Sequence, residues 1–93
     1  MFVNQSYTKA EREWVSLVKQ IACANCDAPG PVEGHHTKQS NAYSMAGLCS
    51  DCHRGPQGWH GDRTLMRIYK HDENDLISIT VSRVYKLLRF LKP

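Results

Sequence analysis

The sequence has no long apolar run. No stretch approaches the roughly 20 apolar residues that a membrane-spanning helix needs, so we expect no membrane span and no membrane partner. The first residues, MFVNQSYTKAEREW, contain no apolar segment followed by small residues, the pattern of a secretory signal. We therefore expect a cytoplasmic protein, in which cysteines serve more often as metal ligands than as disulfides.

Repeats and low-complexity tracts are also absent. The chain has 93 residues, of which 41% are apolar and 23% are charged, a composition typical of a globular protein and not of a disordered one. We expect a single domain over residues 1–93. A domain of this size buries a thin core and commonly needs a further staple, such as a metal ion. The net charge of +3 permits a nucleic-acid partner without requiring one.

Helical patterns flank the middle of the chain. A capping box of Thr8 and Glu11 predicts a helix over residues 8–21. The segment LISITV near the other end is rich in β-branched residues and would suit a strand. Its apolar residues nevertheless continue with a period of 3.6, which favours a helix over residues 75–91. That helix would carry three basic residues, which either face solvent or contact DNA: Arg83, Lys86 and Arg89.

The middle of the chain, residues 22–72, predicts short elements. Two short segments, residues 35–38 and 43–50, fit the strands of a hairpin. A short helix is expected to begin near Ser50 or Asp51 and to be interrupted by RGPQG, and helical spacing returns over residues 62–71. Together these elements predict a small α+β domain stapled by zinc.

Two Cys-x-x-Cys pairs give the strongest spacing signal. Cys23 and Cys26 form the first pair, Cys49 and Cys52 form the second, and 22 residues separate the pairs. Two residues between cysteines let both sulfur atoms reach one ion across a tight turn. Two such turns complete a tetrahedral site of four thiolates, which has no open position and is therefore structural. We expect structural Zn²⁺ there.

The second pair also belongs to the string Cys-x-x-Cys-His, which has other interpretations. This string attaches c-type haem, but attachment requires export and would leave Cys23 and Cys26 without a role. A redox dithiol would require a βαβ unit, which the sequence does not resemble. Zinc binding accounts for both pairs.

A four-cysteine site leaves the histidines unexplained. His35 and His36 are adjacent, and neighbours on a strand point to opposite faces, so the two residues need different roles. One imidazole can bind a metal ion while the other acts as a base. His53 and His60 can bring further imidazoles to the same ion, and the sequence leaves open whether one or both do so. Histidine ligands with open positions are typical of a catalytic metal.

These motifs together resemble a known family. In order, CANC, GHHTK, GLCSDCH and GWH are similar to the motifs of the HNH, or ββα-metal, endonucleases, and especially to their small phage and prophage branch. The resemblance covers about residues 14–69 and implies a ββα-metal core with an N-terminal and a C-terminal helix. It also implies hydrolysis of DNA phosphodiester bonds and, for a phage-encoded protein, a location in the host cytoplasm.

The resemblance also implies a role for each site residue. His36 would be the general base that activates water, and Asn41 would be the middle asparagine of the pattern. His35, His60 and His53 would hold a catalytic divalent cation, such as Mg²⁺, Mn²⁺, Ni²⁺ or Zn²⁺, which stabilises the leaving oxygen. Nearby basic residues are candidate DNA contacts: Lys38, Arg54 and Arg63.

One segment departs from the pattern of this family. The segment after the histidine pair, TKQSNAYS, is shorter than the flap of the family, so a larger phage or recombination assembly would supply part of the DNA contact. The alternative function is a non-catalytic zinc-knuckle module that binds DNA or a protein. The surplus histidines distinguish the two, because a module with four thiolates needs none of them.

Overall fold

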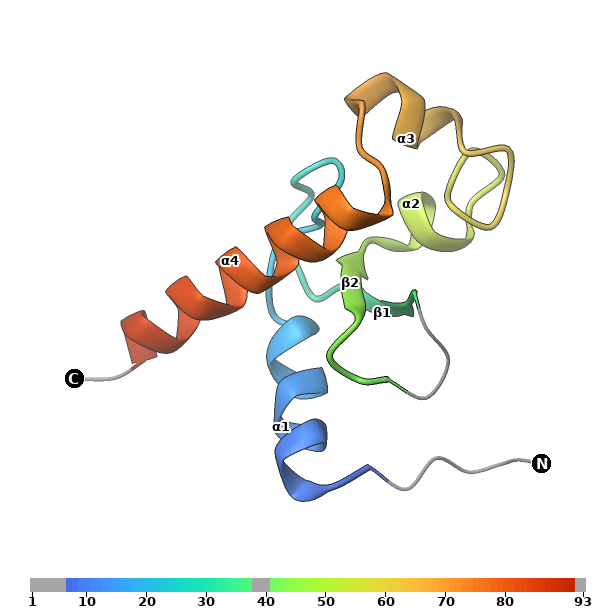
Figure 1. Ribbon diagram of the computed structural model, residues 1–93. Helices are drawn as coiled ribbons and strands as arrows, with labels where there is room; N and C mark the ends of the chain where they lie inside the picture. Colours follow the sequence, from blue (N-terminus) through green and yellow to red (C-terminus); the bar gives the residue numbers. More distant parts are fainter. Residues whose placement is uncertain (1–6, 38–40, 92–93) are drawn as a thin grey trace.

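The computed structural model describes residues 7–37 and 41–91 of the chain (Figure 1). Two antiparallel strands and several helices make up this part, which confirms the expected α+β class. The elements follow in the order α1 (Lys9–Val18), β1 (Glu33–His36), β2 (Met45–Leu48), α2 (Ser50–Arg54), α3 (Thr64–Tyr69) and α4 (Glu73–Leu91).

Helix α1 begins at the predicted capping box. The hydroxyl of Thr8 accepts a hydrogen bond from the backbone N–H of Glu11, whose carboxylate accepts one from the backbone N–H of Thr8. The helix ends at Val18, three residues earlier than the pattern predicts, and the chain continues through a turn that still buries Ile21. The expected apolar stripe therefore contacts the core from the helix and from the turn after it.

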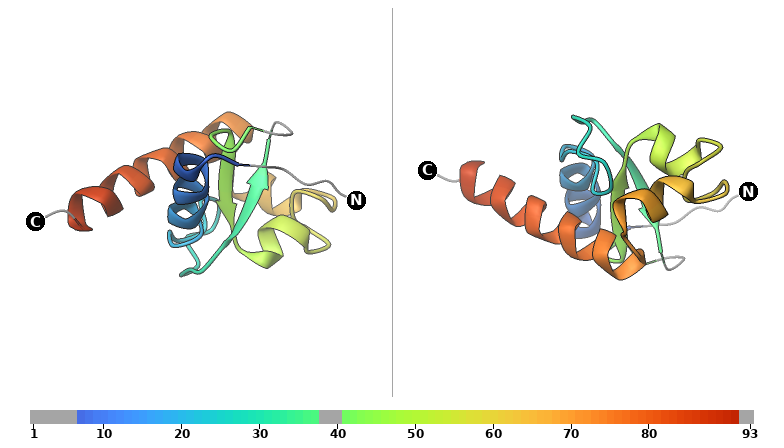
Figure 2. Two further views of the ribbon diagram at one scale, coloured as in Figure 1. Left: turned by 90° about the horizontal axis from the view of Figure 1, so that it is seen from below. Right: turned by 90° about the horizontal axis from the view of Figure 1, so that it is seen from above.

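The hairpin lies between two layers of helix. Strand β1 pairs with β2 so that His35 is opposite Ala46 and His36 is opposite Met45. Strand β2 is shorter than expected, and β1 has the expected length of four residues but starts two residues before His35. Figure 2 shows α1 on one side of the hairpin and α2 and α3 on the other. Alternate residues of β1 therefore face different helices.

Helix α4 packs against β2 along one face. Leu76, Thr80 and Val84 are fully buried at a spacing of four residues, so the strand alternative for LISITV is wrong. The hydroxyl of Thr80 accepts a hydrogen bond from the backbone N–H of Gly47 and donates one to the carbonyl of Leu76. The helical pattern was decisive because it places every buried residue on the side that meets β2.

The C-terminal half of α4 extends beyond the rest of the described chain (Figure 1). Phe90 and Leu91 are mostly exposed there. Among the described residues, no helix combines the length and apolar character needed to cross a membrane.

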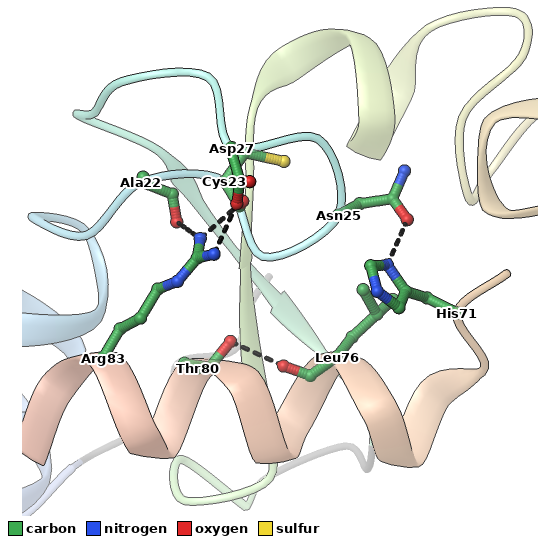
Figure 3. A network of polar contacts seen from close by, with 8 residues as sticks. All are labelled: Ala22, Cys23, Asn25, Asp27, His71, Leu76, Thr80 and Arg83. Carbon is green, nitrogen blue, oxygen red and sulfur yellow. Dashed lines mark hydrogen bonds and ion pairs between the residues drawn. The ribbon is translucent and has the colours of Figure 1, made fainter. Parts of the chain in front are cut away.

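Arg83 does not join a free basic ridge on α4. Its guanidinium donates hydrogen bonds to the carbonyl oxygens of Ala22 and Cys23, at 3.1 and 2.8 Å, and pairs with the carboxylate of Asp27 (Figure 3). These contacts join α4 to the loop that carries the first cysteine pair. The sequence left two options for Arg83, a solvent-facing side chain or a DNA contact. Neither describes it, because two carbonyl oxygens and one carboxylate of the protein already accept hydrogen bonds from its guanidinium.

Two candidate metal centres

The four cysteines converge on one point. Cys23 and Cys26 lie in the loop after α1, Cys49 precedes α2, and Cys52 lies within α2. Their sulfur atoms all lie within 4.8 Å of one another, although the two pairs are far apart in the sequence. The chain therefore brings together a set of four thiols, as the spacing predicts, and we name it the cysteine centre.

The distances at the cysteine centre suit a tetrahedral ion. The sulfur atoms of Cys26 and Cys49 are 3.7 Å apart. A zinc–sulfur bond of about 2.3 Å gives an edge of about 3.8 Å for a tetrahedron of sulfur ligands. A disulfide requires about 2.05 Å, and all four cysteines are free thiols. The donor set and the spacing both fit a structural metal such as zinc.

Burial and backbone amides act in opposite directions on these thiols. Burial raises the pKa values of Cys26 and Cys52 above the ordinary thiol value. Burial also opposes ionisation of Cys23, but the backbone N–H groups of Cys49, Cys26 and Asn25 together hold its pKa below that value. Without an ion, the thiols of Cys26 and Cys52 therefore stay protonated, and binding of a metal displaces their protons.

Asn25 supports the cysteine centre from the outside. Its amide nitrogen donates to the sulfur of Cys52 at 3.4 Å and to the carbonyl of Leu65 at 3.3 Å. Its amide oxygen is 2.9 Å from the Nδ1 atom of His71 (Figure 3). His71 therefore belongs to the surroundings of this centre, through a contact that spans 46 residues of sequence.

Three of the four site histidines also converge. One nitrogen each of His35, His53 and His60 lies within 4.8 Å of the others. The ring centroids are 5.2 Å apart for His35 and His53, 5.1 Å for His35 and His60, and 4.9 Å for His53 and His60. Strand β1 supplies the first residue, α2 the second and the following loop the third. We name this group the histidine centre.

The loop between α2 and α3 returns His60 to His53. The backbone N–H of Trp59 donates to the carbonyl of Cys52 at 2.7 Å, and that of His60 donates to the carbonyl of His53 at 3.1 Å. Gly58 permits this close approach, because a Cβ atom there would lie 2.6 Å from the carbonyl oxygen of Cys52. The RGPQG interruption is therefore the turn that brings both histidines to one place.

A carboxylate orients His53. The Oε1 atom of Glu33 lies 2.8 Å from Nδ1 of His53, and Arg54 pairs with the same carboxylate through two nitrogens. Hydrogen bonds from Arg54 and His53 hold the pKa of Glu33 below its ordinary value. Metal-bound histidines usually donate their second ring nitrogen to a carboxylate in this way. Nδ1 is thus engaged, and Nε2 remains for an ion.

His35 is the buried member of the histidine centre. Its side chain is 4% exposed, and its Nε2 atom is buried without a hydrogen-bond partner among the described residues. Burial, together with the neighbouring His53 and His60, lowers the pKa of His35 to about 4. A neutral imidazole has one nitrogen with a free lone pair, which can bind a metal ion, so the residues present fit a histidine-bound divalent cation.

Trp59 forms one wall of the histidine centre. Its ring lies 5.5 Å from the ring of His35, and the guanidinium of Arg63 lies 4.0 Å from the centre of the indole. Arg63 also donates to the carbonyl of Trp59 at 2.8 Å. Arg63, a candidate DNA contact, therefore lies beside the histidines. Arg54, another candidate, is paired with Glu33.

His36 lies outside the histidine centre. It is exposed and shares an open hollow of about 440 Å³ with Val15 of α1 and with Lys19, the residue after that helix, on the side of the hairpin away from α2. Its Nε2 atom is 2.6 Å from the hydroxyl of Tyr7, and the two rings are stacked. The alternation of the strand thus separates the adjacent histidines, as expected, but it also places the predicted base apart from the predicted ligands.

The other predicted site residues have separate positions. Asn41 lies between the strands, where its side-chain oxygen accepts from the backbone N–H of Tyr43 at 3.0 Å and its carbonyl accepts from Ser44. It stabilises that turn and belongs to neither centre. Lys38 lies outside the described residues.

Comparison with known proteins gives no relative. No family model matches the chain, and neither the curated proteins nor the solved structures include a match.

Proposed function

We propose that the protein is a metal-dependent endonuclease of the HNH type, with a ββα-metal core formed by β1, β2 and α2. The observation that carries the proposal is the convergence of His35, His53 and His60 beside a complete set of four cysteines. A structural zinc site with four thiolates needs no imidazoles, and three imidazoles leave positions open on an ion. The oriented Nδ1 of His53 adds to this argument.

Each residue then has a task in phosphodiester hydrolysis. His35, His53 and His60 hold a divalent cation, which supplies Lewis-acid chemistry at the scissile phosphate when bound. His36 takes a proton from water, and the oxygen of that water attacks phosphorus. The bond to the 3′ oxygen breaks, and this oxygen gains a proton from solvent. Arg63 would contact the phosphate backbone.

The position of His36 sets a condition on this mechanism. Its Nε2 atom is occupied by Tyr7, so the attacking water approaches Nδ1 unless the Tyr7 hydroxyl moves away. A general base must come within about 3 Å of the proton that it takes, although free enzymes often hold catalytic groups in looser arrangements.

A second candidate function is a non-catalytic module with two metal sites that binds DNA or a protein. The contact between His36 and Tyr7, on the far side of the hairpin from the histidine centre, favours it. In that function His36 would anchor the segment that precedes α1 and would have no chemical role.

Variants of His36 distinguish the two functions. The zinc-loaded chain is incubated with supercoiled plasmid and Mg²⁺, Mn²⁺, Ni²⁺ or Co²⁺, and nicked DNA is measured. The nuclease proposal predicts nicking by the unchanged protein and its loss in His36→Ala, at an unchanged zinc content. If His36→Ala nicks at the original rate, His36 is not the base. If no cation supports nicking, the non-catalytic module is the better description.

A further inference from the structure

One carboxylate near the histidine centre, that of Glu73, belongs to none of the sequence motifs. Glu73 is the first residue of α4 and lies 38 residues after His35 in the sequence. Its Oε2 atom is 3.8 Å from Nε2 of His35. Within residues 7–37 and 41–91, that nitrogen is buried and has no hydrogen-bond partner. A buried polar atom left unpaired is costly, so an acid directed at it calls for an explanation.

We propose that Glu73 is a positioning residue of the histidine centre. Its carboxylate accepts a hydrogen bond from Nε2–H of His35 and so presents Nδ1 of that ring to the ion. The present distance exceeds a hydrogen bond by about 1 Å. Because the side chain of Glu73 is 41% exposed, it has room to turn and close this gap.

The arrangement at His53 supports this assignment. There Glu33 engages Nδ1 at 2.8 Å and leaves Nε2 for the ion. Glu73 would do the same for His35 from the opposite ring nitrogen. Each of these two imidazoles then has its own carboxylate, and both carboxylates come from elements outside the α2 segment and the loop that carries His60.

A direct bond from Glu73 to the ion is the competing arrangement. The atoms that converge within 4.8 Å of one another come from His35, His53 and His60, and this group does not include the Glu73 carboxylate. On a tetrahedral ion such as Zn²⁺, a fourth protein ligand would also close the site, which is the pattern of a structural ion. The geometry therefore favours an outer role for Glu73.

The inference rests on the metal-binding half of the proposed function and does not require DNA cleavage. Its test is calorimetric titration of the zinc-loaded protein with Ni²⁺, an ion that imidazole ligands bind well. Loss of an outer carboxylate typically weakens metal binding by about 10–100-fold. We expect that loss for Glu73→Ala and a smaller one for Glu73→Gln, whose amide oxygen still accepts a hydrogen bond.

Asp75→Asn is the matched control. Asp75 lies in the same first turn of α4, and its side chain accepts from the backbone N–H of Asp72 at 2.9 Å, which an amide oxygen can also do. The change removes the same charge from the same helix end, so it reports any general effect of charge. We expect its affinity for Ni²⁺ to stay within about twofold, because no histidine depends on it.

Two further measurements exclude a merely structural effect of Glu73. In a His35→Ala background, Glu73→Ala should cause no additional loss of affinity, because the residue acts through His35. In ¹⁵N spectra of the imidazoles, His35 should carry its proton on Nε2 in the unchanged protein and lose that preference in Glu73→Ala.

Specific results would overturn the inference. The titrations would do so if Glu73→Ala bound Ni²⁺ as tightly as the unchanged protein, if the unchanged protein bound no second ion, or if Asp75→Asn lost as much Ni²⁺ affinity as Glu73→Ala. A loss of affinity that adds to that of His35→Ala would also do so. So would a His35 ring that carries its proton on Nδ1. The last result would indicate that Nε2 faces the ion. Absence of plasmid nicking, with these affinities as expected, would refute the nuclease and leave the role of Glu73 intact.

Discussion

Cys52 and His53 are consecutive residues of α2, yet their side chains belong to different centres. The sulfur of Cys52 converges with three other cysteines, and the imidazole of His53 converges with two other histidines. One helical segment of five residues therefore supports both candidate ions. The position of His53 depends on the cysteine centre, because α2 is too short to be stable without tertiary contacts.

This relationship predicts an asymmetry between two substitutions. His53→Ala should lower the metal content from two ions per chain to one, with zinc retained at the cysteine centre. Cys52→Ser should lose both ions, since structural zinc contributes on the order of 10 kcal/mol to folding and holds α2 in place. Native mass spectrometry of chains loaded with Zn²⁺ and Ni²⁺ measures both contents. Retention of Ni²⁺ by Cys52→Ser at the original affinity would show that the centres are independent.

The contact between Glu33 and His53 should also affect the affinity of the histidine centre for a metal ion. Glu33→Ala removes the carboxylate that orients His53 and should weaken Ni²⁺ binding by about 10–100-fold. Arg54→Ala is the control, because it removes the partner of Glu33 and leaves the contact between Glu33 and His53 in place. Calorimetric titration should find Arg54→Ala within about threefold of the unchanged protein. Equal losses in both variants would mean that the ion pair matters and the orientation of His53 does not.

The lowered pKa of His35 predicts its behaviour in solution. With zinc at the cysteine centre and no second ion, the imidazole should stay neutral from pH 8 down to about pH 5 and titrate near 4. An unfolded chain takes up this proton near pH 6.5. The stabilisation from neutral His35 is therefore complete above pH 6.5 and declines as the pH falls toward 4. The proton resonances of the His35 ring report the titration, and a midpoint between 6 and 7 would contradict the burial seen here.

Substitution of Arg83 should lower the stability of the fold and should not remove a DNA contact. Arg83→Ala removes hydrogen bonds to the carbonyls of Ala22 and Cys23 and should lower the free energy of unfolding by about 2 kcal/mol. Lys86→Ala, on the same helix, should change it by less than about 0.5 kcal/mol, as is usual for exposed positions. Urea unfolding of the zinc-loaded proteins measures the difference. Similar values for the two variants would show that Arg83 does not join α4 to the cysteine loop.

Local signals in the sequence were sufficient for much of the fold. The capping box of Thr8 and Glu11 places the start of α1, because its hydrogen bonds join residues three apart. The cysteine spacing predicts the cysteine centre for a similar reason, since each pair spans a single turn. The helical period of the last segment overrides its β-branched composition, because Leu76, Thr80 and Val84 must share one buried face.

Contacts between distant residues could not be predicted in this way. Glu33, Glu73 and Asn25 carry no motif of their own, and each gains its role from a partner at least 20 residues away. The pairing of Tyr7 with His36 has the same origin. Strand alternation does separate His35 from His36, but only the packing of α1 and α2 on opposite sides of the hairpin shows how far their surroundings differ.

The most direct test of a catalytic role for the histidine centre is whether DNA cleavage depends on the ion bound there. The zinc-loaded chain is incubated with supercoiled plasmid, with and without Mn²⁺, and compared with His35→Ala. If the histidine centre is catalytic, the unchanged protein should nick DNA only when Mn²⁺ is present, and His35→Ala should not nick it at all. Both proteins should retain one zinc ion per chain. Equal nicking by His35→Ala, or no nicking with any divalent cation, would contradict a catalytic role for the histidine centre.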